Sequence, residues 1–141
     1  MKHIRFFLVL LPLLIIAACD NSDLWEKLPD PVQTFINKYF PNSELQSVAV
    51  SDKGCSVRID NGPGMSFDAA SQWTSVNGYG MPLPSVMLYD QLPEKLYNYL
   101  DETENLGSVF SMTRDKTAYE VKLMDTDIKY NIATGELSGT D

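Results

Sequence analysis

The feature that most limits how this chain can fold is a strand-turn-strand pattern that it contains twice. The first copy covers residues 55–68 and the second covers residues 119–131. In both copies apolar and polar residues alternate, which is typical of strands with one buried and one exposed face. Residues common in turns interrupt each copy near its middle. The sequence therefore predicts two antiparallel hairpins, each with a dry and a wet face.

The repetition extends well beyond the hairpins. Matching residues recur at a spacing of 64 positions, which becomes 63 after the second hairpin turn. The matched pairs are Leu28 with Leu92, Pro29 with Pro93, Val32 with Leu96, Phe35 with Tyr99, Ile36 with Leu100, Leu45 with Val109, Val57 with Val121, Ile59 with Leu123 and Phe67 with Tyr130. Because this register spans predicted helix, turn and strand, it indicates an internal duplication. We expect a first repeat with its connector over residues 27–90 and a second repeat over residues 91–141.

Each predicted repeat begins with an amphipathic helix, at residues 31–40 and 93–102. In the first helix Asp30 can cap the free backbone amides, Pro31 suits the first helical position, and Pro41 ends the helix. The apolar residues of this helix recur at helical spacing and are Val32, Phe35, Ile36, Tyr39 and Phe40. The expected fold class is α+β, with two tandem repeats of a helix followed by three to four antiparallel strands. The helices would pack side by side on one face of a shared antiparallel sheet.

Residues 1–18 have the pattern of a signal peptide. A short basic head precedes residues 6–17, an uncharged apolar run shorter than the stretch of about 20 residues that a membrane-spanning helix needs. The run ends in Ala17-Ala18-Cys19, which resembles the lipobox of bacterial lipoproteins. This resemblance implies that Cys19 becomes the first mature residue and carries the lipid that holds the protein to the bilayer. Residues 19–26 would then form a polar, lipidated tether at the periplasmic side or at the cell surface.

The charge of the chain limits the partners that it can bind. Without residues 1–18 the chain keeps nine of its eleven Lys and Arg residues and all nineteen acidic residues, so its formal charge is −10. Such an acidic protein repels nucleic acids and anionic lipid headgroups. We therefore expect no nucleic-acid binding, and we expect attachment to the lipid bilayer through the acylated Cys19.

The mature chain lacks the residues that most enzyme chemistry needs. The one histidine, His3, lies in the signal peptide, which excludes a histidine base, a catalytic triad and a histidine metal site. No cysteine pair has zinc-ligand spacing, and Cys55 lies on the apolar row of a predicted strand, as a core residue would. Several aspartates lie near the hairpin turns, where aspartate is a common turn residue. The sequence predicts no enzyme activity, no metal site and no cofactor.

The repeat and its turns also carry a family resemblance. The chain resembles the beta-lactamase-inhibitor-like, PepSY-like family of bacterial envelope proteins over nearly all of residues 27–139. The matching elements are Leu28-Pro29, Tyr39-Phe40-Pro41, Phe67-Asp68, Trp73, Leu92-Pro93, Tyr119-Glu120-Val121 and Tyr130-Asn131. The second repeat departs from the pattern, with Asn131 in place of aspartate and Glu136 in place of tryptophan. The resemblance implies a binding or inhibitory role, in which the polar face of a curved sheet meets a partner protein.

Two surfaces are candidates for binding that partner. On the wet face of the hairpins, Arg58 and Lys122 would provide charge. The glycine- and proline-rich connector between the repeats carries Tyr79 and Met81. We expect these two side chains to form the most exposed apolar pair, beside Trp73 at the edge of the sheet, because aromatic side chains dominate protein interfaces. Alternatively, the apolar residues of the connector fold back and seal the seam between the repeats.

Together these patterns predict a non-enzymatic lipoprotein of the bacterial cell envelope. We expect it to act as a protein-binding, inhibitor-like module whose partner is an unidentified envelope protein. The alternative is a passive structural or scaffold lipoprotein.

Overall fold

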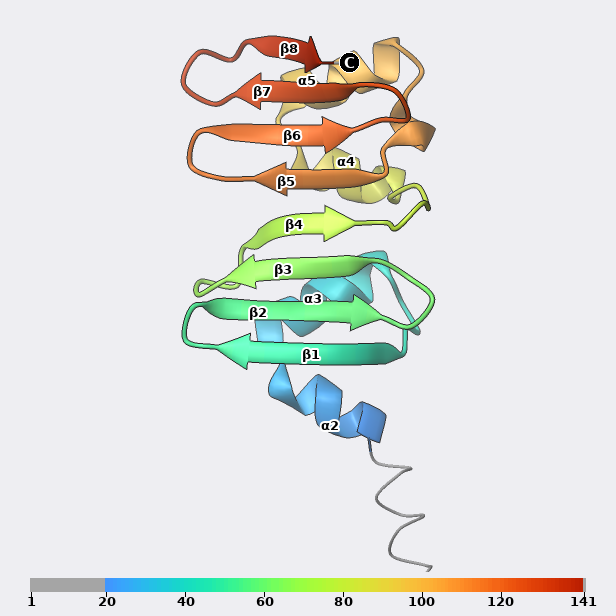
Figure 1. Cartoon of the computed structure of the whole chain (residues 1–141), viewed down its shortest axis with the longest axis vertical. Coiled ribbons are helices and arrows are strands. Elements are labelled where there is room, and N and C mark those ends of the chain that lie inside the picture. The colour runs from blue at the N-terminus through green and yellow to red at the C-terminus, as the bar shows by residue number, and fades with distance from the viewer. Residues whose placement is uncertain (1–19, 141) are drawn as a thin grey trace, which may run out of the picture.

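The computed structural model describes residues 20–140, so the predicted signal peptide and Cys19 lie outside the described residues. The described part of the chain has an α+β fold with four α-helices and an eight-stranded antiparallel sheet (Figure 1). In chain order the elements are α2 (Asp20–Lys27), α3 (Asp30–Tyr39), β1 (Leu45–Ser51), β2 (Gly54–Ile59), β3 (Gly64–Asp68), β4 (Trp73–Asn77), α4 (Ser85–Gln91), α5 (Glu94–Glu102), the 3-10 helix η1 (Leu106–Ser108), β5 (Ser111–Arg114), β6 (Ala118–Lys122), β7 (Asp127–Asn131) and β8 (Leu137–Thr140). No helix among these is long and apolar enough to cross a membrane.

The strands follow one another across the sheet in the order of the sequence, from β1 at one edge to β8 at the other (Figure 1). Both predicted hairpins are confirmed. In the first, β2 pairs with β3 and Val57 lies opposite Met65, and in the second, β6 pairs with β7 and Val121 lies opposite Ile128. The two halves of the chain meet where β4 pairs with β5. The sheet therefore continues without a break across the midpoint of the chain.

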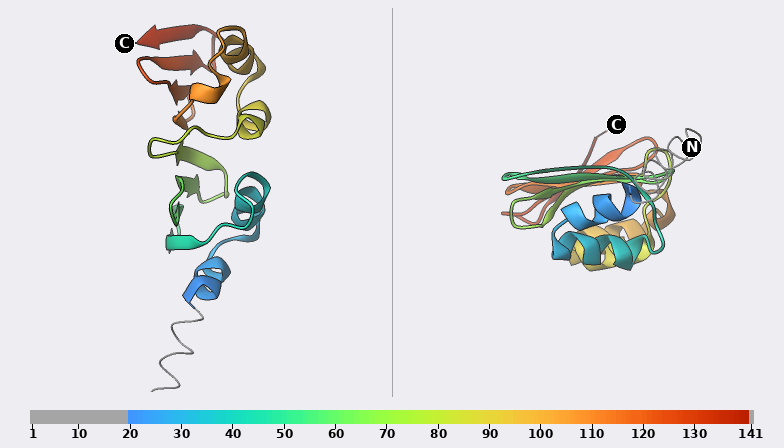
Figure 2. Two further views of the ribbon diagram at one scale, coloured as in Figure 1. Left: turned by 90° about the vertical axis from the view of Figure 1, so that its right-hand side faces the viewer. Right: turned by 90° about the horizontal axis from the view of Figure 1, so that it is seen from below.

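Three helices, α3, α4 and α5, lie on one side of the sheet and leave the opposite face uncovered (Figure 2). Helices form at the two predicted places, as α3 and α5, but they do not pack side by side. The short helix α4 lies between them (Figure 1) and buries Met87 and Leu88. This helix covers seven residues, too few to show a helical period in the sequence, and it occupies the space in which α3 and α5 were expected to meet.

The segment predicted to be a polar tether is also helical from Asp20 onward, where α2 lies against β1. Leu24 and Trp25 pack against the core, and the Asn21 side-chain amide donates a hydrogen bond of 3.0 Å to the Leu45 carbonyl oxygen. These contacts hold the helix at the β1 edge of the sheet. Two apolar side chains in a polar segment are therefore enough to dock it as a helix, and its attachment to lipid stays a prediction.

The hydrophobic core is continuous through both halves of the described chain. Its largest fully buried side chains include Trp73, Ile36, Leu96 and Met112. Cys55 is buried in this core, as its position on the apolar row of the strand predicted. Burial raises the pKa of its thiol, which disfavours the reactive thiolate form and agrees with a packing role.

A chain of polar contacts connects α3, α4 and β4. The Tyr39 hydroxyl donates to Asp90 Oδ2 at 2.8 Å and accepts a hydrogen bond of 2.9 Å from Gln91 Nε2. The indole Nε1 of Trp73 donates to Gln91 Oε1 at 3.0 Å, and Lys38 lies 3.1 Å from Asp90. The hydrogen bonds from Tyr39 and Lys38 lower the pKa of the Asp90 carboxyl below its ordinary value. Asp90 therefore stays ionised and fixes α4 against α3.

Candidate binding surfaces beside the connector

The connector, residues 78–84, runs from the end of β4 to the start of α4. Both Gly78 and Leu83 donate their backbone N–H groups to carbonyl oxygens of residues 109–110, and each bond measures 2.8 Å. No side chain fits at Gly78, because a Cβ there would lie 1.9 Å from the carbonyl oxygen of Met81. The connector is thus fixed to the second half of the chain near both of its ends.

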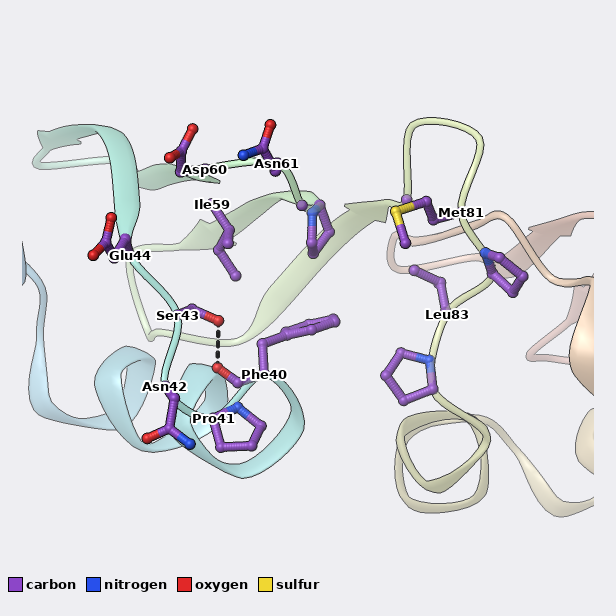
Figure 3. Close-up of a pocket in the computed structure, with 15 residues that line it drawn as sticks. Phe40, Pro41, Asn42, Ser43, Glu44, Ile59, Asp60, Asn61, Met81 and Leu83 are labelled. Carbon is purple, nitrogen blue, oxygen red and sulfur yellow. Dashed lines mark hydrogen bonds between the residues drawn. The ribbon is translucent and has the colours of Figure 1, made fainter.

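A cleft with a volume of about 580 Å³ opens beside the connector (Figure 3). It lies between the loop after α3, the β2–β3 turn and the connector. We call it the apolar cleft, and its lining residues are Phe40, Pro41, Asn42, Ser43, Glu44, Ile59, Asp60, Asn61, Gly62, Pro63, Gly78, Met81, Pro82, Leu83 and Pro84. Phe40 and Ile59 line one side, and Met81 and Leu83 line the other (Figure 3). Its volume falls in the range of ligand sites, about 300–1,000 Å³.

The apolar cleft offers few hydrogen-bond donors. Four of its lining residues are prolines, which have no backbone N–H. Seven more already donate their backbone N–H to carbonyl oxygens of the chain, namely Phe40, Ile59, Asp60, Gly62, Gly78, Met81 and Leu83. Glu44 and Asp60 add carboxylates, and no lysine or arginine lines the cleft. The cleft therefore suits an apolar group that is carried beside positive charge, and it disfavours anions.

A second, polar groove of about 800 Å³ lies on the uncovered face of the sheet. We call it the serine groove, and its lining residues are Gln46, Ser47, Val48, Ala49, Ser56, Val57, Arg58, Gly64, Met65, Ser66, Ser75, Asn77 and Tyr79. Ser56, Ser66 and Ser75 lie opposite one another on three neighbouring strands, and each is next to at least one buried residue. The guanidinium carbon of Arg58 lies 3.8 Å from the centre of the Tyr79 ring. The groove thus combines hydroxyl groups, one cation and one aromatic ring.

The expected exposure of Tyr79 and Met81 is confirmed, since the two residues are 55% and 59% exposed. They are not the most exposed apolar residues, because Met124 reaches 78%. They also belong to different surfaces, since Tyr79 lines the serine groove and Met81 lines the apolar cleft. Their role in binding stays a prediction. Leu83 is buried, as the alternative of a sealed seam predicted for the connector.

Two other predicted site residues lie elsewhere. The expectation that Trp73 borders the sheet edge is wrong, because β4 pairs with both β3 and β5 and Trp73 is only 2% exposed. Lys122 is exposed on β6, on the same face as Arg58. Four strand spacings separate it from Arg58, or about 19 Å. The structure therefore groups Arg58 with Tyr79 and leaves Lys122 apart.

The sequence did not indicate that Phe40 and Ile59 line a cleft. Both were assigned to the apolar face of a predicted helix or strand, and that assignment is correct for Ile59, which is buried. The available signal was the position of Pro41, Pro63 and Pro82, each in a predicted turn or loop between regular elements. Rigid turns that meet at one end of the fold form such a cleft, but their meeting depends on the tertiary structure.

The described residues form two surfaces that could bind a ligand, but they offer few groups for metal or histidine chemistry. Within residues 20–140, no group of His, Cys, Asp or Glu side chains could hold a metal ion. The single histidine of the sequence, His3, lies outside the described residues.

The comparison with protein families found a match over more than half of the chain. The family model described as "Putative beta-lactamase-inhibitor-like, PepSY-like" matches residues 53–135. A search of curated proteins found no match.

Several solved structures are similar to the chain, among them the following three. A "putative periplasmic protein from DUF2874 family" from Bacteroides vulgatus is 25% identical, with a TM-score of 0.70, and the match covers 83% of this chain and 93% of that chain. A "putative calcium-regulated periplasmic protein" from Bacteroides thetaiotaomicron is 23% identical, with a TM-score of 0.68 and coverage of 83% and 93%. A "putative periplasmic protein of unknown function" from Bacteroides vulgatus is 19% identical, with a TM-score of 0.68 and coverage of 82% and 94%. The second and third share the fold. With the match to the family model over residues 53–135, these findings show that the chain belongs to the beta-lactamase-inhibitor-like, PepSY-like family.

Proposed function

We propose that the chain is a lipid-anchored envelope protein that binds another protein and catalyses no reaction. The family match and the periplasmic descriptions of the structural neighbours support the envelope location. The lipobox-like Ala17-Ala18-Cys19 supports the anchor. Mass spectrometry of protein extracted from membranes should find Cys19 as its first residue, with acyl chains attached. A mature chain that begins elsewhere, or an unmodified Cys19, would refute the anchor.

The proposal includes the tandem organisation, with residues 27–90 and 91–141 derived from one duplicated unit. The spacing of 64 residues supports it, as does the order of elements, in which helices precede four strands in each half. Strand-by-strand superposition of the two halves in a crystal structure would test the duplication.

The apolar cleft is the observation that carries the binding function. Its rigid walls and the exposed Met81 provide a preformed apolar site at the surface, and exposed apolar sites of this kind mark contacts with other molecules. Its carboxylates and its small number of free donors favour a partner segment that places a large apolar side chain beside Lys or Arg. Two other residues predicted for partner binding suit this role less, because Trp73 is buried and Lys122 stands apart.

Substitution of Met81 by aspartate tests this function. The tagged mature protein captures partners from envelope extract, and each captured protein is then purified and titrated against wild type and variant. We expect M81D to weaken binding at least about tenfold, because the variant loses the apolar contact of Met81 and would bury a charged group against the partner's apolar side chain. M124D is the matched control, since it makes the same change at a more exposed methionine away from the cleft.

Three outcomes separate the alternatives. Loss of binding in M81D with retention in M124D supports the cleft as the binding site. Equal affinities of M81D and wild type would refute it. Failure to capture any saturable partner under varied growth conditions would favour the passive scaffold. The inhibitor-like form of the proposal adds one requirement, that the captured partner is an enzyme whose activity falls on binding.

A further inference from the structure

The serine groove lies on the face of the sheet opposite the helices and has no part in the proposed function. Facing residues of four neighbouring strands form a line across it, and they are Ala49, Ser56, Ser66 and Ser75. Their side chains are short, so the groove is open above them. Three of the four carry hydroxyl groups, which both donate and accept hydrogen bonds.

Arg58 is the only charged residue that lines the groove. Its side chain makes no hydrogen bond or ion pair with residues 20–140, and its Nε atom is buried without a hydrogen-bond partner. A guanidinium has five N–H donors. A buried donor without an acceptor raises the free energy of the folded state, and a ligand that supplies acceptors nearby would offset part of that cost. Arg58 as a whole is half-buried, which leaves part of its side chain open to the groove.

The position of Arg58 is fixed by Tyr79, whose ring centre lies 3.8 Å from the guanidinium carbon. Gly64 lies opposite Arg58 on the next strand and makes room for this stack. A Cβ at Gly64 would lie 2.9 Å from Cε2 of Tyr79 and 3.5 Å from Cδ of Arg58. On the connector, the Tyr79 N–H donates to Asn77 Oδ1 at 2.8 Å, which holds the loop that carries the ring. The cation is therefore oriented before any ligand binds, which lowers the entropic cost of binding.

We propose that the serine groove binds a sugar acid, a ligand that carries a carboxylate beside several hydroxyl groups. The planar fork of Arg58 matches a carboxylate with two parallel hydrogen bonds. The hydroxyls of Ser56, Ser66 and Ser75 and the amide of Asn77 match the ring hydroxyls. Because the chain has a formal charge of −8, it repels anions in general, and retention of an anion requires a local cation. Arg58 is the cation that the groove provides.

The first experiment titrates the protein with D-glucuronate while its backbone and arginine Nε signals are followed by NMR. We expect saturable shifts for Arg58 Nε–H and for the amides of residues 56, 66 and 75. D-Glucose has comparable hydroxyls without the carboxylate, and acetate has the carboxylate without the hydroxyls. Each should bind at least tenfold more weakly than glucuronate. Equal affinity for glucose or for acetate would overturn the proposal. In the first case the carboxylate, and in the second case the hydroxyl groups, would contribute nothing to binding.

Matched variants locate the site. R58Q should weaken glucuronate binding at least tenfold, whereas K122Q removes a cation from the same sheet face and should leave the affinity unchanged. R58K keeps the charge without the fork and should fall between wild type and R58Q. The amide spectrum of each variant shows whether it is folded. Equal losses in R58Q and K122Q, or wild-type affinity in R58K, would overturn the assigned geometry. The capped residue N-acetyl-L-glutamic acid α-amide keeps its side-chain carboxylate. Tighter binding of this compound than of glucuronate would assign the groove to an acidic peptide instead.

Discussion

Replacement of Trp73 by alanine should lower the free energy of unfolding by about 3–5 kcal/mol, the usual cost of removing a buried aromatic side chain. The ring is buried between the sheet and the helices, with its centre 6.0 Å from that of Tyr119 and 4.2 Å from the guanidinium carbon of Arg114. Domains of this size are stable by only about 5–15 kcal/mol. Urea unfolding followed by far-UV circular dichroism measures the loss.

The stability of two further variants should be compared with that of W73A. W73F keeps most of the ring volume but loses the N–H that donates to Gln91. Its free energy of unfolding should therefore lie between those of wild type and W73A. M124A removes a well-exposed side chain and should change stability by no more than about 0.5 kcal/mol. If W73A were as stable as M124A, Trp73 could not be a core residue of the fold described here.

Replacement of Gly78 by alanine should lower stability by about 2–4 kcal/mol, through backbone strain and the loss of one hydrogen bond. The added Cβ would lie 1.9 Å from the carbonyl oxygen of Met81 and 3.1 Å from that of Phe110, so the backbone must move. That movement breaks the bond from the Gly78 N–H to the Phe110 carbonyl and displaces the connector. Because the connector carries both Met81 and Tyr79, G78A should weaken binding in the apolar cleft and in the serine groove together.

Gly107 provides the control for this substitution. It does not have a positive φ, and a Cβ added there would have no atom of a more distant residue within 4 Å, so G107A should change stability by no more than about 0.5 kcal/mol. Thermal unfolding of both variants, with binding measured on the folded protein, tests the pair. A G78A variant as stable as G107A would show that the connector can move freely, and would contradict the rigid loop on which both surfaces depend.

The hairpins and the helices α3 and α5 could be predicted because each is determined by a short run of residues. Cys55, Val57 and Ile59 alternate with polar residues, and that alternation alone specifies which face of the strand is buried. The same pattern placed Arg58 on the exposed face. Predictions of this kind need only the local period of the chain, and the structure agrees with them.

The features that could not be predicted depend on contacts between distant segments. Trp73 was expected at an edge because nothing in its own strand shows that β5 pairs on its other side. The apolar cleft could not be predicted for a similar reason, because three separate turns form it and turn residues follow no period. The stack of Arg58 on Tyr79 requires Gly64 to lie opposite Arg58. That pairing depends on the register between β2 and β3.

The sequential order of the strands also has a consequence for how fast the protein folds. Every strand pairs only with its neighbours in the chain, and most of these pairs close a short loop. The exception is β4 with β5, where the intervening chain from Asn77 to Ser111 must be ordered first. Folding rates rise as contacts become more local. We therefore expect the hairpins of each half to form rapidly, and the β4–β5 pairing, with the docking of α4 between α3 and α5, to limit the rate at which the whole sheet is completed.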